Sequence, residues 1–140
     1  MTSSGAEPIE RLVLDTSAYS RLRAQHAETA AHIARAETVL LPVTVIGELE
    51  AAFRLGARVA ANRVSLADFL AEPFVFVLDV TRSVAQKYGE MYADLRRRGS
   101  PVSSNDIWIA AATLDSGGHL LTFDTDFERF EGLPLTLMKA

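Results

Sequence analysis

The chain has 140 residues, of which 49% are hydrophobic and 23% are charged, as expected for one globular domain with a substantial core. It contains no cysteine, which excludes disulfides and thiolate metal ligands. Because the formal net charge is −4, the overall field repels nucleic acid, and a polyanionic substrate would require metal ions or a local basic patch.

We expect residues 1–10 to form a flexible tail, because they are polar and lack the charged and apolar regions of a signal peptide. Residues 11–140 are expected to fold as a single domain. The absence of cysteine fits a cytoplasmic protein. No apolar run approaches the roughly 20 residues that span a bilayer, so we expect no membrane partner.

The first predicted element is a short buried strand over residues 12–14, and Asp15 follows it directly. Either Thr16 or Ser17 can cap the next helix, and we expect one or two short helices from there to about residue 36. The later elements are predicted as strands over 38–41, 74–78, 119–123 and 135–137, and as helices over 44–56, 59–72, 81–98 and 106–114.

Alternating strands and helices predict a three-layer α/β/α sandwich with a mostly parallel sheet of four to five strands. The strand over 74–78 alternates little between apolar and polar residues, so we expect it to be buried on both faces. The segment after the first strand contains no glycine, which excludes a dinucleotide-binding fingerprint and a phosphate-binding loop.

The helix from residue 44 carries an apolar stripe with an acidic residue at each edge. Glu48 and Glu50 both lie about 40° outside this stripe, so periodicity does not choose between them as candidates for a site. The stripe itself consists of Val45, Ile46, Leu49, Ala52 and Phe53.

Acidic residues recur where a parallel sheet forms its ligand-binding crevice. Asp15 and Asp124 follow strands, Asp106 begins a helix, and Glu48 lies in the helix after the second strand. Each position alone is equally compatible with a cap, a turn or a solvated helix edge. Converging carboxylates favour Mg²⁺ or Mn²⁺ over zinc, because hard cations prefer oxygen ligands and the three histidines show no ligand spacing.

Four segments resemble the PIN-domain ribonucleases, and in particular the VapC-type toxins of prokaryotic toxin–antitoxin pairs. They are LVLDTSAYSRL (12–22), LPVTVIGELEAAF (41–53), SSNDIWIAAATL (103–114) and LLTFDTDFERF (120–130). The resemblance implies that Asp15, Glu48, Asp106 and Asp124 form the catalytic metal site, with Asp15 and Asp106 as central ligands. It selects Glu48 over Glu50, and it assigns supporting roles to Thr16, Ser17 and Asp126.

The implied function is a Mg²⁺-dependent endoribonuclease, in which Mn²⁺ can substitute, acting as the toxin of a toxin–antitoxin pair. The implied partners are an RNA substrate, a cognate antitoxin protein and a second copy of the chain, which would contact the helix pair over 44–56 and 59–72. The alternative is a catalytically silent PIN-fold module that binds RNA or a partner. A phosphohydrolase of the haloacid dehalogenase type is disfavoured, because Ser17 stands where that class requires a second Asp.

Arg96, Arg97 and Arg98 form the only basic cluster in the sequence. The cluster is either a solvated helix end, where cations complement the helix dipole, or an RNA-binding site beside the acidic residues.

Overall fold

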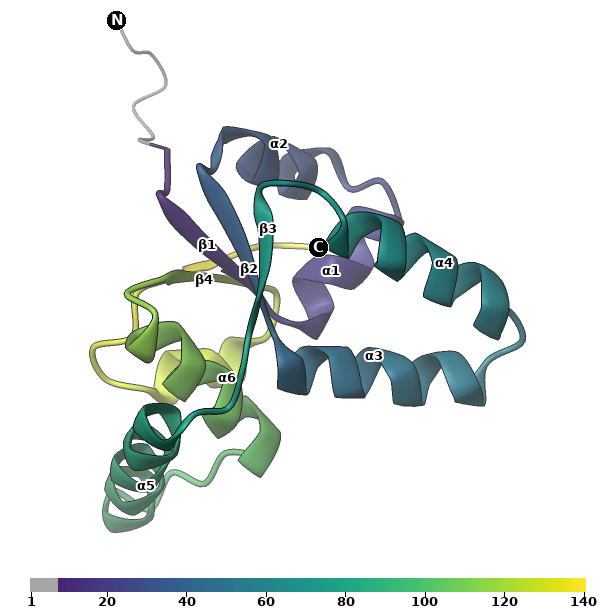
Figure 1. Ribbon diagram of the computed structural model, residues 1–140. Helices are drawn as coiled ribbons and strands as arrows, with labels where there is room; N and C mark the ends of the chain where they lie inside the picture. Colours follow the sequence, from purple (N-terminus) through teal and green to yellow (C-terminus); the bar gives the residue numbers. More distant parts are fainter. Residues whose placement is uncertain (1–7) are drawn as a thin grey trace, which may run out of the picture.

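The computed structural model describes residues 8–140, which form a parallel β-sheet covered by helices (Figure 1). The strands are β1 (Arg11–Leu14), β2 (Thr38–Pro42), β3 (Val75–Leu78), β4 (His119–Thr122) and β5 (Leu135–Leu137). The helices are α1 (Thr16–Arg23), α2 (Ala27–Arg35), α3 (Val43–Leu55), α4 (Val59–Leu70), α5 (Arg82–Arg97) and α6 (Ser104–Asp115), with a 3₁₀ helix η1 (Thr125–Arg129).

The strand order is β3-β2-β1-β4-β5, so the first strand lies at the centre of the sheet. Val13 of β1 is in register with Leu40 on one side and with Leu120 on the other. Figure 1 shows α1, α2 and α4 on one side of this sheet and α5 and α6 on the other. The predicted α/β fold with a parallel sheet is confirmed, and all five strands are parallel.

The central strand is buried on both faces, as its uninterrupted apolar run predicts. Leu12, Val13 and Leu14 are fully buried and join the main hydrophobic core. This core also receives side chains from helices on both sides of the sheet, including Tyr19 of α1 and Ile107 of α6. The rigid central strand therefore fixes the position of Asp15 immediately after it.

The expectation that the third strand is buried on both faces is wrong. β3 pairs only with β2 in the described sheet, which makes it an edge strand, and Phe76 is 51% exposed. A short apolar run has the same pattern at the edge of a parallel sheet as at its centre, so the sequence alone did not separate the two.

The segment between β1 and β2 forms two helices, which separate at Gln25, where φ is 64°. The helix expected over 106–114 begins earlier, at Ser104, because Ser103 provides the N-cap. Residues 1–7 of the expected N-terminal tail lie outside the described residues. Within residues 8–140, no helix has the length and apolarity required to cross a membrane.

The helix pair α3–α4 extends from the sheet as a hairpin (Figure 1). Phe53, Leu66 and Phe69 of this pair are buried in the main core, and Val59 and Leu70 are partly buried against it. Leu55 and Val64 instead remain exposed.

Candidate functional site

The carboxyl edge of the sheet brings together the segments that follow β1, β2 and β4. These three strands are neighbours, so Asp15, the start of α3 and Asp124 lie at one end of the same parallel array. The N-terminus of α6 adds Asp106 to this edge, since the charges of Asp124 and Glu48 both act on Asp106. We call Asp15, Glu48, Asp106, Asp124 and Asp126 the acidic cluster.

Asp15 is the buried member of the acidic cluster, with an exposed fraction of 3%. It is the N-cap of α1, and its Oδ1 accepts hydrogen bonds from the Ala18 backbone N (2.8 Å) and Ser17 Oγ (2.7 Å). Its Oδ2 accepts a third hydrogen bond from Thr122 Oγ1 at 2.5 Å. The orientation of this carboxylate is thus fixed by three donors from two segments of the chain.

Hydrogen bonds also join the segment after β1 to the segment after β4. Ser17 Oγ accepts a hydrogen bond from the Phe123 backbone N (3.0 Å), and Thr122 Oγ1 accepts one from the Asp124 backbone N (2.9 Å). Thr122 therefore links Asp15 to Asp124 through a single hydroxyl. Thr122 was not among the predicted site residues, because in the sequence a threonine at the end of an apolar strand is indistinguishable from an ordinary strand residue.

Asp106, Asp124 and Asp126 form the part of the acidic cluster that best matches a metal site. Each offers a carboxylate oxygen, and these oxygens lie within 4.8 Å of one another. All three residues are half-buried, and the Asp126 backbone N donates a hydrogen bond to Asp124 Oδ1 at 2.9 Å. The resemblance gave Asp126 only a supporting role, whereas the geometry places it beside Asp106 and Asp124.

Glu48 of α3 lies on the side of its helix that faces α1. Thr16 Oγ1 donates a short hydrogen bond to Glu48 Oε1, which connects α3 to the first turn of α1. Glu50, the alternative that periodicity left open, is held by Arg63 at 3.3 Å and by Arg54 at 3.9 Å. The structure thus brings Glu48, rather than Glu50, into the acidic cluster.

The crowding of carboxylates changes the protonation of Asp106. Burial and the negative charge of Asp124, with further contributions from Glu48 and Asp126, raise the pKa of Asp106 to about 6. Burial also raises the pKa of Asp15, although the hydrogen bonds from Thr122, Ser17 and Ala18 act in the opposite direction. Burial is the largest cause of both pKa shifts, and the negative charge of Asp124 contributes to each of them. A cation bound at this edge would relieve that part of the shifts.

The basic cluster at the end of α5 is largely occupied by local contacts. Arg98 pairs with Asp94 at 2.9 Å and donates to the Arg129 backbone carbonyl at 2.7 Å. Arg96 donates to the Tyr92 hydroxyl at 3.0 Å and lies over the Tyr92 ring. Of the three arginines, Arg97 is the one for which the described residues provide no such partner.

Comparison with known proteins identifies the same fold. A family model described as the PIN domain matches residues 12–133 of the chain. No curated protein matches the sequence significantly.

Among solved structures, VapBC2 from Rickettsia felis, bound to a DNA fragment from its promoter, matches with a TM-score of 0.82 at 20% identity. That match covers 92% of this chain and 99% of the other. VapBC-5 from Mycobacterium tuberculosis, a member of the VapBC family of toxin–antitoxin systems, matches with a TM-score of 0.71 at 25% identity, covering 93% and 98% of the two chains. VapC20 from Mycobacterium tuberculosis, a toxin that cleaves the sarcin–ricin loop, matches with a TM-score of 0.64 at 21% identity, covering 84% and 92%. Since the PIN-domain model spans most of the described residues, the chain belongs to the PIN-domain family.

Proposed function

We propose that the protein is a magnesium-dependent endoribonuclease that acts as the toxin of a toxin–antitoxin pair. The observation that carries this proposal is the convergence of Asp106, Asp124 and Asp126, whose carboxylate oxygens lie within 4.8 Å of one another at the carboxyl edge of the sheet. Membership of the PIN-domain family and the RNA-cleaving structural neighbour support the same conclusion.

The donor set fits a hard divalent cation. The three candidate ligands are carboxylates, of which Asp126 also pairs with Arg129 at 3.7 Å. Mg²⁺ binds such oxygen ligands while keeping several of its waters. We assign Asp106, Asp124 and Asp126 as residues that would hold Mg²⁺, or Mn²⁺ in its place, with Asp15 and Glu48 completing the site. The chemistry that a divalent ion supplies when bound is activation of a water molecule and neutralisation of negative charge on the phosphoryl group.

The protein's own groups orient this site. The three donors to Asp15 keep its carboxylate ionisable in one fixed position despite its burial. Thr16 holds Glu48 against the first turn of α1, and Ser17 holds the backbone at Phe123, next to Asp124. Such partners commonly determine the metal affinity of a carboxylate site, so Thr16 and Ser17 act as positioning residues.

The proposed partners follow from the same comparisons. Structural neighbours include VapBC complexes, which supports a cognate antitoxin for this chain. We assign the protein to the cytoplasm, where its RNA substrate is found. The exposed Leu55 and Val64 on the α3–α4 hairpin support a homodimer that covers them.

The function is tested by incubating the full chain with structured and single-stranded RNA in Mg²⁺, in Mn²⁺ and in EDTA. We expect cleavage only with a divalent ion. In Asp106→Asn we expect the cleavage rate to fall about 10²–10³-fold, because the charge of the transition state loses its stabilisation. Asp115→Asn is the matched control, since Asp115 ends the same helix and pairs with Lys87. RNA that binds without being cut, under all metal conditions, would favour the catalytically silent module instead.

A further inference from the structure

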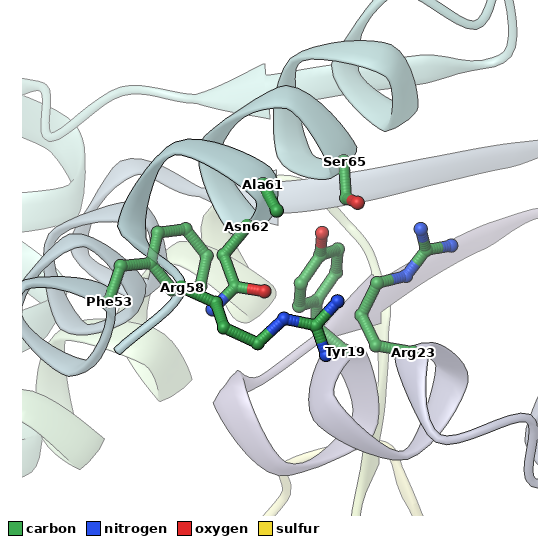
Figure 2. A pocket seen from close by; sticks show the side chains of 7 residues that line it. All are labelled: Tyr19, Arg23, Phe53, Arg58, Ala61, Asn62 and Ser65. Atoms are coloured by element: carbon green, nitrogen blue, oxygen red, sulfur yellow. The ribbon is translucent and has the colours of Figure 1, made fainter. Parts of the chain in front are cut away.

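A second polar pocket lies between α1 and the start of α4, outside the acidic cluster (Figure 2). Its volume is about 250 Å³, which is large enough for a phosphate group with its waters. Its polar and aromatic lining comes from Tyr19 and Arg23 of α1, Phe53 of α3, Arg58 immediately before α4, and Asn62 and Ser65 within α4.

The Tyr19 side chain carries a buried hydroxyl that has no partner. Tyr19 is 2% exposed, and its hydroxyl oxygen makes no hydrogen bond within the described part of the chain. Figure 2 shows this hydroxyl directed toward Ala61 and Ser65 of α4, among the residues that line the pocket. Leaving a buried hydroxyl unpaired costs free energy, so its placement favours a ligand that accepts its hydrogen bond. Burial raises the pKa of Tyr19, which keeps the hydroxyl a donor at neutral pH.

The pocket is positively charged although the protein as a whole is acidic. Arg23 and Arg58 both line it, and neither forms an ion pair with any residue between 8 and 140. No Asp or Glu contributes to the lining. The Arg23 guanidinium lies over the Tyr19 ring, 5.5 Å from its centroid, which places it next to the unpaired hydroxyl. Guanidinium groups bind phosphate with two parallel hydrogen bonds, so two arginines without an ion pair beside an unpaired hydroxyl suit an oxyanion.

The N-terminus of α4 provides a further preference for an anion. This helix has 12 residues, no side-chain cap and no acidic residue in its first turn. Its first backbone N–H groups lack intrahelical partners, and the helix dipole favours negative charge at this end. Because Ala61 and Asn62 belong to the first turns and line the pocket, the helix terminus and the two arginines act on the same space.

We propose that this pocket binds a backbone phosphate of the RNA strand, a few nucleotides from the bond that is cut. The inference rests on the proposed ribonuclease function and adds a substrate-binding subsite to it. Tyr19 and Arg23 lie four and eight residues after Asp15 on the same helix, which corresponds to about 6 and 12 Å along the helix axis. At about 3.4 Å of rise per stacked nucleotide, the pocket is two to four nucleotides from the acidic cluster. A strand can therefore occupy both sites, and the pocket offsets the repulsion between RNA and an acidic protein.

The test measures binding of a fluorescein-labelled single-stranded RNA of about ten nucleotides to the full chain in EDTA, as a function of salt. In the double variant Arg23→Gln/Arg58→Gln, we expect about tenfold weaker binding and a salt slope that is smaller by about 0.7 for each lost phosphate contact. The matched control is Arg35→Gln/Arg82→Gln, which removes the same charge from two exposed arginines without assigned contacts. Equal losses in both double variants would overturn the proposal, because they would reflect net charge alone.

The variant Tyr19→Phe distinguishes the contribution of the Tyr19 hydroxyl to RNA binding from that of the two arginine charges. We expect this variant to bind the RNA several-fold more weakly with an unchanged salt slope, because the hydroxyl is neutral, while the ligand-free protein melts at the same or a higher temperature. A purely structural Tyr19 would leave RNA affinity unchanged, which contradicts the proposal.

Competition and cleavage assays identify the occupant and keep the two proposals distinct. Inorganic tripolyphosphate should displace the RNA from the wild-type chain, whereas displacement by polyglutamate at equal charge would assign the pocket to an acidic protein and overturn the phosphate subsite. Mg²⁺-dependent cleavage that is insensitive to the pocket substitutions would refute the subsite and leave the nuclease proposal standing. RNA binding that depends on the pocket, without cleavage under any metal condition, would support the subsite and refute the nuclease proposal.

Discussion

The carboxylates of the acidic cluster divide into two regions that differ in the number of hydrogen-bond donors that reach them. Asp15 is buried and receives three hydrogen bonds, from Ser17, Ala18 and Thr122. Asp106, Asp124 and Asp126 are half-buried and face one another, and the donor that reaches Asp124 is the backbone N of Asp126. The first region is satisfied by hydrogen bonds from the protein itself. The second gathers three carboxylates, for which the described residues provide one ion pair, between Arg129 and Asp126 at 3.7 Å.

This difference distinguishes Asp15, which has a structural role, from the three carboxylates that are available to bind a ligand. Two like charges 4 Å apart repel by about 4 kcal/mol at an effective dielectric constant of 20, so a cluster of this kind destabilises the metal-free fold. Asp15, in contrast, caps α1 and joins β1 to β4, so its removal has a structural cost in addition to any catalytic one. The comparison yields predictions with opposite signs for residues of identical chemistry.

The largest expected effect is stabilisation by the cation. At a Mg²⁺ concentration of 100 times Kd, the free energy of unfolding should rise by about 2.7 kcal/mol, because the ion binds the folded state alone. Asp124→Asn should remove this gain, while Asp115→Asn at the far end of α6 should retain it. Chemical denaturation with and without Mg²⁺ measures both, and an equal gain in Asp124→Asn would place the ion elsewhere.

Thr122→Val should weaken the link between the two regions. The substitution preserves shape but removes the donor to Asp15 and the acceptor of the Asp124 backbone N–H. We expect Mg²⁺ affinity, measured by calorimetry, to fall about 10–100-fold, as is typical when a partner of a ligand is lost. Thr113→Val is the matched control, because Thr113 is also fully buried but bonds only the Ile109 carbonyl in its own helix. Comparable losses in both variants would indicate a general effect of core substitution.

Truncation of an acid to alanine should change the free energy of unfolding in opposite directions in the two regions. Asp15→Ala removes a helix cap and leaves hydroxyl donors without an acceptor, so we expect it to lower the free energy of unfolding by about 1–2 kcal/mol. Asp106→Ala removes a charge from a crowded site and should stabilise the metal-free protein at pH 8. Urea denaturation in EDTA compares them, and a loss in both variants would mean that Asp106 also has a structural role.

The acids could be predicted from the sequence because three of them occupy positions that local rules specify. Asp15 and Asp124 follow buried apolar strands, and Asp106 lies in the first turn of a helix, so a parallel topology alone brings them to one edge. The choice of Glu48 over Glu50 required the family resemblance, since both flank the apolar stripe symmetrically. In the structure the distinction arises from Thr16, which lies 32 residues earlier in the chain.

Other features depend on packing between distant elements and leave no local pattern. The burial of Tyr19 beneath α4 depends on how the α3–α4 hairpin lies against α1, so a pocket with an unpaired hydroxyl cannot be read from periodicity. The exposure of Phe76 depends on which strand ends the sheet. In both cases the residue type fits its element equally well with or without the tertiary contact.

The smallest expected effect is a dependence of stability on pH that differs in sign between Asp106 and Asp115. Because the pKa of Asp106 is raised from 3.8 to about 6 in the folded chain, the folded state binds more protons than the unfolded state between these values. The stability advantage of Asp106→Asn over the wild type in EDTA should therefore be complete above pH 6 and should disappear as the pH falls toward 4. Ser83 and Lys87 lower the pKa of Asp115, so Asp115→Asn should be less stable than the wild type above pH 4, and this deficit should shrink in acid. If the stability differences of both variants instead change with pH in the same direction, the pKa of Asp106 is not raised in the folded chain.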